Sequence, residues 1–147
     1  MQSLSRHLSA AQVRGLERLG DAYIPGDEQL PSFARTGCVE HVDRILDYMD
    51  SADLKSLKLL LGVFAYVPHL VIVALVALLE TSTRVPGPVG AALRFVRMGI
   101  KGLVVSLYYS GYVAQSYKGP SPLDVLGYEV GVYTADVDAA NSADTAA

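Results

Sequence analysis

Apolar side chains recur at helical spacing along several stretches of the chain, and short turns rich in proline or glycine separate these stretches. In the first stretch, Ser9 and Gln12 match a capping box, in which each side chain satisfies an unpaired amide at a helix start. The predicted helix ends at the turn 24–27, because proline cannot continue the hydrogen-bond ladder. Its apolar side consists of Val13, Leu16, Gly20 and Tyr23.

The second stretch predicts one helix over residues 33–50, with an apolar side and an acidic side. We interpret the acidic side as a solvated helix face, because Arg44 is interleaved and nothing indicates the burial that raises a catalytic carboxyl pKa. Ser51 suits the start of the next helix. The acidic residues of this side are Glu40, Asp43, Asp47 and Asp50.

Residues 59–79 form a run of 21 residues without a charge. A continuous helix of that length would measure about 31 Å, close to the hydrocarbon thickness of a bilayer. Pro68 and His69 stand at its centre, however, and proline there breaks or kinks a helix. Two shorter helices that meet at Pro68 and lie buried in protein are the favoured interpretation, with His69 as a buried imidazole bonded to a carbonyl. A membrane span by Leu59–Leu79 stays open as the alternative.

After a loop at residues 85–88, the pattern predicts a last long helix whose apolar face runs from Leu93 to Leu107. A row of cations occupies the adjacent face at positions i, i+3 and i+7, and tyrosines follow it. Arginine and tyrosine are enriched at interface hot spots, so this group is a candidate partner interface, with an ordinary exposed helix face as the alternative. The candidate residues are Arg94, Arg97, Lys101, Tyr108, Tyr109 and Tyr112.

Together these elements predict an all-α protein with a single small domain of about five helices over residues 1–133. An irregular, acidic tail over residues 134–147 is expected to be flexible or bound to a partner. A length of 147 residues suits one domain. The apolar share of 51% and the mean hydropathy of +0.30 exclude a disordered, polar chain.

Charge is distributed unevenly, and the apolar middle of the chain is also its cationic part. Residues 1–53 hold five basic and nine acidic side chains, residues 54–118 hold seven and one, and residues 119–147 hold five acidic side chains only. A cationic, apolar middle fits a membrane surface or an acidic protein partner. The net charge of −3 argues against a nucleic-acid binder, which usually presents a strongly basic face.

Residues that carry chemistry are scarce. The three histidines match no metal-binding spacing, and no nucleophile elbow, dinucleotide fingerprint or phosphate loop occurs. The single Cys38 excludes an internal disulfide and a cysteine-rich metal site, and we interpret it as a small buried apolar residue. We therefore expect no catalytic, cofactor-binding or metal residues in this chain, and an independent small enzyme is the weakest hypothesis.

Several segments resemble the small subunit (subunit 3) of gluconate 2-dehydrogenase and its relatives. The similar features are a helix that ends in the turn Ile24-Pro25-Gly26-Asp27 and a later apolar helix with Val42-Asp43-Arg44-Ile45-Leu46. A tyrosine-bearing segment at residues 107–110 and Leu126-Gly127-Tyr128 are also similar. The resemblance covers roughly residues 8–130, although the middle is more apolar than the family pattern.

The resemblance implies a non-catalytic, chaperone-like subunit of a heterodimer that stabilises or matures a large flavoprotein. That partner would be an FAD-dependent dehydrogenase of the glucose–methanol–choline type, acting on sugars, sugar acids or alcohols, with FAD in the partner and none in this chain. Many relatives carry a twin-arginine signal that this N-terminus lacks, so a cytoplasmic location is expected. Co-export to the periplasm and membrane association are the alternatives, and a small membrane anchor is the second functional hypothesis.

Overall fold

A computed structural model describes residues 5–128, and within that range the chain is all-α, with no strand. The predicted fold class is therefore confirmed, whereas the predicted tail at 134–147 lies outside the described residues. The longer helices are α1 (Ala10–Tyr23), α4 (Ser51–Phe64), α5 (His69–Glu80) and α6 (Gly87–Tyr108). The shorter elements are α2 (Phe33–Thr36), α3 (Asp43–Leu46), α7 (Pro122–Val125) and the 3-10 turns η1 (Cys38–His41) and η2 (Thr81–Arg84).

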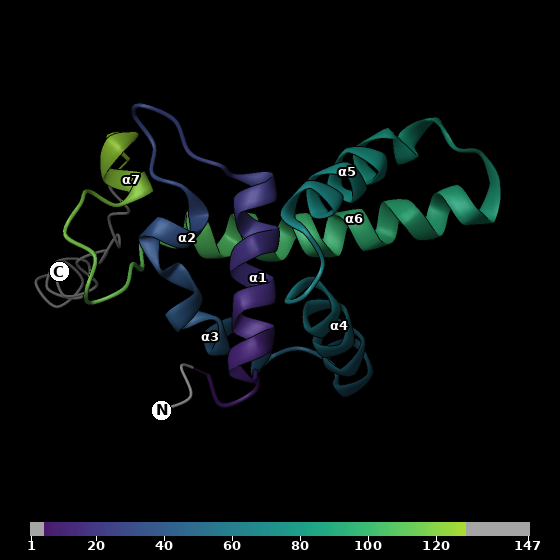
Figure 1. Ribbon diagram of the computed structural model, residues 1–147, viewed down its shortest axis with the longest axis horizontal. Helices are drawn as coiled ribbons and strands as arrows, with labels where there is room; N and C mark the ends of the chain where they lie inside the picture. Colours follow the sequence, from purple (N-terminus) through teal and green to yellow (C-terminus); the bar gives the residue numbers. More distant parts are fainter. Residues whose placement is uncertain (1–4, 129–147) are drawn as a thin grey trace, which may run out of the picture.

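Helix α1 crosses the middle of the molecule, with α4 and α5 on one side and α2 and α3 on the other (Figure 1). The predicted capping box is confirmed, because Ser9 accepts from the Gln12 amide and the Gln12 side chain accepts from the Ser9 amide. Leu16 and Leu19 are fully buried at the crossing. Gly15 faces the backbone of α4 so closely that a Cβ there would collide with the Leu61 carbonyl oxygen.

The helix predicted over residues 33–50 is wrong as one continuous element, because α2, η1 and α3 divide it. The division begins at Gly37, which has a φ of 61° and ends α2 in the left-handed conformation that glycine adopts without strain. Just beyond, the Ala114 amide donates to the Thr36 carbonyl at 2.8 Å, and the Ala114 side chain fills the space that a Cβ on Gly37 would need. A contact across the fold therefore sets this break.

The acidic side predicted as a solvated face lies at the surface, and two of its four carboxylates also bind the N-terminal segment. Asp47 accepts from Arg6 Nη2 at 2.7 Å, and His7 Nε2 lies 2.8 Å from its other oxygen. Asp43 accepts from the Ser5 hydroxyl and from the Arg6 amide. Asp50, rather than the expected Ser51, is the N-cap of α4.

The predicted break at Pro68 is confirmed, since α4 ends at Phe64 and α5 begins directly after the proline. Proline has no backbone N–H, so the Phe64 carbonyl four residues earlier loses its helical donor. Arg18 of α1 supplies the missing donor, because its Nη1 donates to the Phe64 carbonyl at 3.2 Å and to the Ala65 carbonyl at 2.8 Å. The corner between α4 and α5 is thus stabilised by α1.

Candidate functional site

Helices α5 and α6 form an antiparallel hairpin, residues 69–108, whose far part projects from the rest of the molecule along its longest axis, while the C-terminal end of α6 passes behind α1 (Figure 1). Its base joins the core through Ile100, Leu103 and Val104 of α6. Its far end is the turn η2 and the loop before α6. The hairpin is the largest projection that Figure 1 shows in the described part of the chain.

Helix α5 is apolar on nearly every side, yet only Ile72 and Val76 of its 12 residues are buried. Leu70 is 79% exposed and Leu78 is 62% exposed, so large apolar side chains face solvent at both ends of the helix. This corrects the expectation that the whole 59–79 run lies buried in protein. It also corrects the interpretation of His69, which is exposed and not a buried imidazole. A helix that is apolar all round is normally covered on all sides.

Helix α6 has a second apolar side besides the one that joins the core. Phe95 is 78% exposed and Met98 is 76% exposed, and both lie on the side that also carries Gly99, Gly102 and Val105. We call these five residues the open face of α6. Sequence reasoning missed this face, although the spacing 95, 98, 102 and 105 is a helical signal.

The predicted cationic row is held against the neighbouring helix by one carboxylate. Arg97 Nη1 donates to Glu80 at 2.8 Å, and Lys101 Nζ donates to the other Glu80 oxygen at 3.1 Å. Hydrogen bonding from Lys101 lowers the pKa of Glu80 most; desolvation opposes this, and Arg97 lowers the pKa further. Arg94 donates to the Val85 carbonyl at 3.0 Å. The row therefore ties α6 to α5 and η2.

A small polar cluster lies where α1 meets the base of this row. The Tyr23 hydroxyl and Arg97 Nε are buried atoms without a hydrogen-bond partner. Burial raises the pKa of Tyr23, the charge of Glu80 adds to this effect, and Arg97 opposes it. Arg97 is thus only partly accessible, and Lys101, with its side chain 50% exposed, is the cation of this pair that faces solvent more.

The three candidate tyrosines have different surroundings in the structure. Tyr108 is 1% exposed, and its hydroxyl donates to the Pro31 carbonyl at 2.5 Å, so it belongs to the core and not to a surface. Tyr109 packs edge-on against it and is partly exposed. Tyr112 lies under the Arg44 guanidinium, 4.1 Å from the ring centroid, and beside His41. The six predicted residues therefore do not form one surface.

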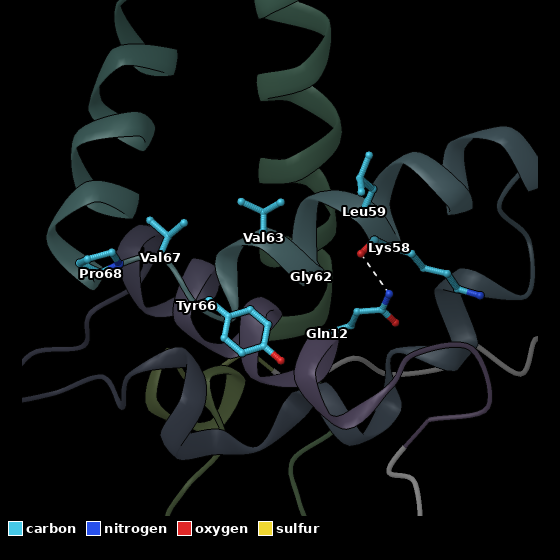
Figure 2. Close-up of a pocket in the computed structure, with 8 residues that line it drawn as sticks. All are labelled: Gln12, Lys58, Leu59, Gly62, Val63, Tyr66, Val67 and Pro68. Atoms are coloured by element: carbon cyan, nitrogen blue, oxygen red, sulfur yellow. Dashed lines mark hydrogen bonds between the residues drawn. The ribbon is translucent and has the colours of Figure 1, made fainter.

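A shallow apolar groove of about 840 Å³ follows the outer side of α4 up to the Pro68 corner (Figure 2). At one end, Gln12 Nε2 donates to the Lys58 carbonyl at 3.0 Å, which joins α1 to α4. Leu59 is 73% exposed and Tyr66 is 77% exposed along its length. The lining residues are Gln12, Lys58, Leu59, Gly62, Val63, Tyr66, Val67 and Pro68.

Within residues 5–128, no group of three or more histidine, cysteine or acidic side chains is placed to hold a metal ion. His41 Nε2 lies 3.1 Å from the Val113 carbonyl oxygen, which ties η1 to the segment after α6. Cys38 is buried, and burial raises the pKa of its thiol to about 11. Both side chains therefore make contacts within the described part of the fold, and that of His41 joins segments 72 residues apart.

None of the helices in the described range is both long enough and apolar enough to cross a membrane. Comparisons of the chain with protein-family models, with curated proteins and with solved structures give no match. The candidate site is therefore identified from the geometry alone. It is the projecting apolar hairpin with a cationic row along one side.

Proposed function

We propose that this protein is a non-catalytic accessory subunit that binds a large FAD-dependent oxidoreductase of the glucose–methanol–choline type and stabilises it. The single observation that carries the proposal is the exposure of large apolar side chains over the projecting α5–α6 hairpin. The kind of partner comes from the sequence resemblance to the gluconate 2-dehydrogenase small subunit.

Physical chemistry supports a covering partner. Monomeric soluble proteins seldom expose continuous apolar patches larger than a few hundred Å², and larger ones mark interaction sites. Full burial of one Leu, Phe or Met side chain contributes about 1.5–3 kcal/mol, so Leu70, Leu78, Phe95 and Met98 alone represent a substantial gain on association. Interfaces of permanent complexes are apolar in this way, like a domain core cut in half.

The proposed division of labour assigns the redox chemistry to the partner. The partner holds FAD and oxidises a sugar, a sugar acid or an alcohol, while this chain supplies a helical surface that stabilises or matures the partner's fold. Glu80, Arg97 and Lys101 support this role by fixing α5 against α6, so that the hairpin meets the partner as one pre-formed unit.

The test is purification of the tagged chain from the cells that produce it, followed by size-exclusion chromatography with a visible absorbance spectrum. We expect co-elution with a larger protein that shows flavin absorbance and oxidises sugars or alcohols with an added electron acceptor. The double substitution Leu70→Ser and Leu78→Ser should release that protein. The matched control is Tyr48→Ser, because Tyr48 is 92% exposed but lies outside the hairpin.

Two results would refute the proposal. The first is a monomeric chain without flavin in plain buffer. The second is carbonate-resistant association with membranes in the absence of any flavoprotein, which would support the membrane-anchor hypothesis instead.

A further inference from the structure

We propose that the open face of α6 receives one amphipathic helix of the partner subunit, and that the flank of this incoming helix is acidic. The inference rests on the proposed function for the existence of a partner and adds where that partner docks and with what chemistry. The open face consists of Phe95, Met98, Gly99, Gly102 and Val105, as defined above.

The shape of the face favours a helix. Phe95 and Met98 stand out as ridges, while a Cβ built on Gly99 or on Gly102 would meet no heavy atom within 4 Å. A hollow of about 500 Å³ beside Gly102 and one of about 280 Å³ beside Gly99 flank the ridges. Ridges and grooves that follow a helix surface are the features into which a second helix packs.

Gly99 and Gly102 lower the stability of α6 unless another helix packs closely against them. Glycine in a helix interior destabilises it by roughly 0.5–1 kcal/mol relative to alanine. Gly15 of α1 illustrates the usual compensation, because its missing side chain lets α4 approach. Among the described residues, Gly99 and Gly102 receive no such approach. A partner helix that packs against them would supply it.

The charge on the Gly102 side of the open face indicates the flank of the incoming helix, whereas Asp53 lines the hollow on the Gly99 side. Arg94 and Lys101 line the hollow beside Gly102 together with Met98 and Val105. Glu80 is the only carboxylate between residues 54 and 118, and both of its oxygens already accept from Arg97 and Lys101. Lys101 remains half exposed, so acidic side chains on the incoming helix would complement this edge.

The same charges disfavour a second copy of this chain as the occupant. The hairpin, residues 69–108, contains Arg84, Arg94, Arg97 and Lys101 against the single Glu80. A symmetric contact between two hairpins would bring together two surfaces with an excess of three positive charges each. Like charges across an interface cost several kcal/mol, so an acidic partner of different sequence fits better.

The experiment places a photo-reactive amino acid at position 98 or 105 of the full chain, in the cells that produce it. Mass spectrometry then identifies the cross-linked segment, with positions 59 and 48 as controls on other surfaces. We expect positions 98 and 105 to cross-link to one segment of another protein that has helical apolar periodicity and an excess of Asp and Glu. Positions 59 and 48 should not cross-link to that segment.

Substitutions at the glycines provide a second readout that does not depend on cross-linking. Gly99→Leu with Gly102→Leu should reduce recovery of the partner at least tenfold while leaving this chain folded, because a Cβ at either position meets no heavy atom within 4 Å. Gly62→Leu is the matched control, since Gly62 also has no heavy atom near its missing Cβ but lies on α4. Lys101→Glu should weaken the complex, and a lysine at the cross-linked acidic position should restore it.

The proposal is overturned if position 98 cross-links to a second copy of this chain, to lipid or to a basic segment. It is also overturned if the Gly99 and Gly102 substitutions leave the complex intact. Flavin in the cross-linked protein is a separate readout. A flavoprotein bound elsewhere would defeat this inference alone, whereas an acidic helix from a protein without flavin would defeat the proposed function alone.

Discussion

Gly15 tests whether a backbone contact between α1 and α4 determines the helix arrangement. In Gly15→Ala, the new Cβ would collide with the Leu61 carbonyl oxygen and lie 2.9 Å from the Leu61 carbonyl carbon. It would also lie 3.2 Å from the Ala65 nitrogen. All three are backbone atoms, so no change of rotamer relieves the clash, and the two helices must move apart.

The expected loss of stability follows from two opposing effects. Overpacking a well-packed site costs typically 1–3 kcal/mol, and a backbone obstacle places Gly15→Ala near the upper end, at about 3 kcal/mol. Removing a glycine from a helix interior returns about 1 kcal/mol. The net loss is therefore about 2 kcal/mol, which lowers the Tm of a domain of this size by about 6–10 °C.

Thermal unfolding followed by circular dichroism measures this change, with Gly62→Ala as the control. A Cβ on Gly62 meets no heavy atom within 4 Å, so Gly62→Ala should raise the free energy of unfolding by about 1 kcal/mol. The two glycines lie on the contacting helices α1 and α4, yet the expected shifts in Tm have opposite signs. A Gly15→Ala variant as stable as Gly62→Ala would refute the reasoning.

Three further measurements test other parts of the described structure. Tyr108→Phe leaves the buried Pro31 carbonyl without its donor and should cost about 1–3 kcal/mol in urea unfolding, whereas Tyr109→Phe should cost little. The hydrogen bond from His7 lowers the pKa of Asp47 from its ordinary 3.8, with desolvation opposing and Arg6 adding to the effect. Ionised Asp47 thus stabilises the fold above pH 3.8, and this contribution is lost as the pH falls through the lowered pKa. Asp47→Asn should therefore show a smaller loss of stability in acid. A pH profile of stability unchanged from that of the unsubstituted protein would contradict this. Burial raises the pKa of Cys38 to about 11, so iodoacetamide at mildly alkaline pH should label it only after unfolding, and rapid labelling of the native chain would be inconsistent with the structure.

Local signals in the sequence were sufficient for the helix boundaries that depend on neighbouring residues. The capping box at Ser9 and the break at Pro68 are of this kind, because each follows from the chemistry of residues within one helical turn. The break at Gly37 could not be predicted in the same way. It depends on the approach of Ala114, which only the folded chain brings into contact.

The contacts of the candidate site likewise could not be predicted from neighbouring residues in the sequence. The cationic row of α6 is visible in the sequence, but its partner Glu80 lies on the preceding helix, 17 residues before Arg97. The burial of Tyr108 depends on Pro31, 77 residues earlier in the chain. Periodicity shows that one side of a helix is apolar, but it does not show which apolar residues the rest of the chain will cover. Tertiary contacts alone determine that Ile100 is buried and Phe95 exposed.

The Arg18 guanidinium helps to set the direction in which the α5–α6 hairpin projects. From α1, Arg18 donates to the Phe64 and Ala65 carbonyls at the corner between α4 and α5, 46 and 47 residues later in the chain. The angle of that corner therefore depends in part on α1. Replacing Arg18 by alanine would remove this donor while leaving the rest of α1 in place, so the angle of the corner would be less constrained. Arg18 therefore acts together with the packing of α1 against α4 and α5 in setting the direction of the hairpin.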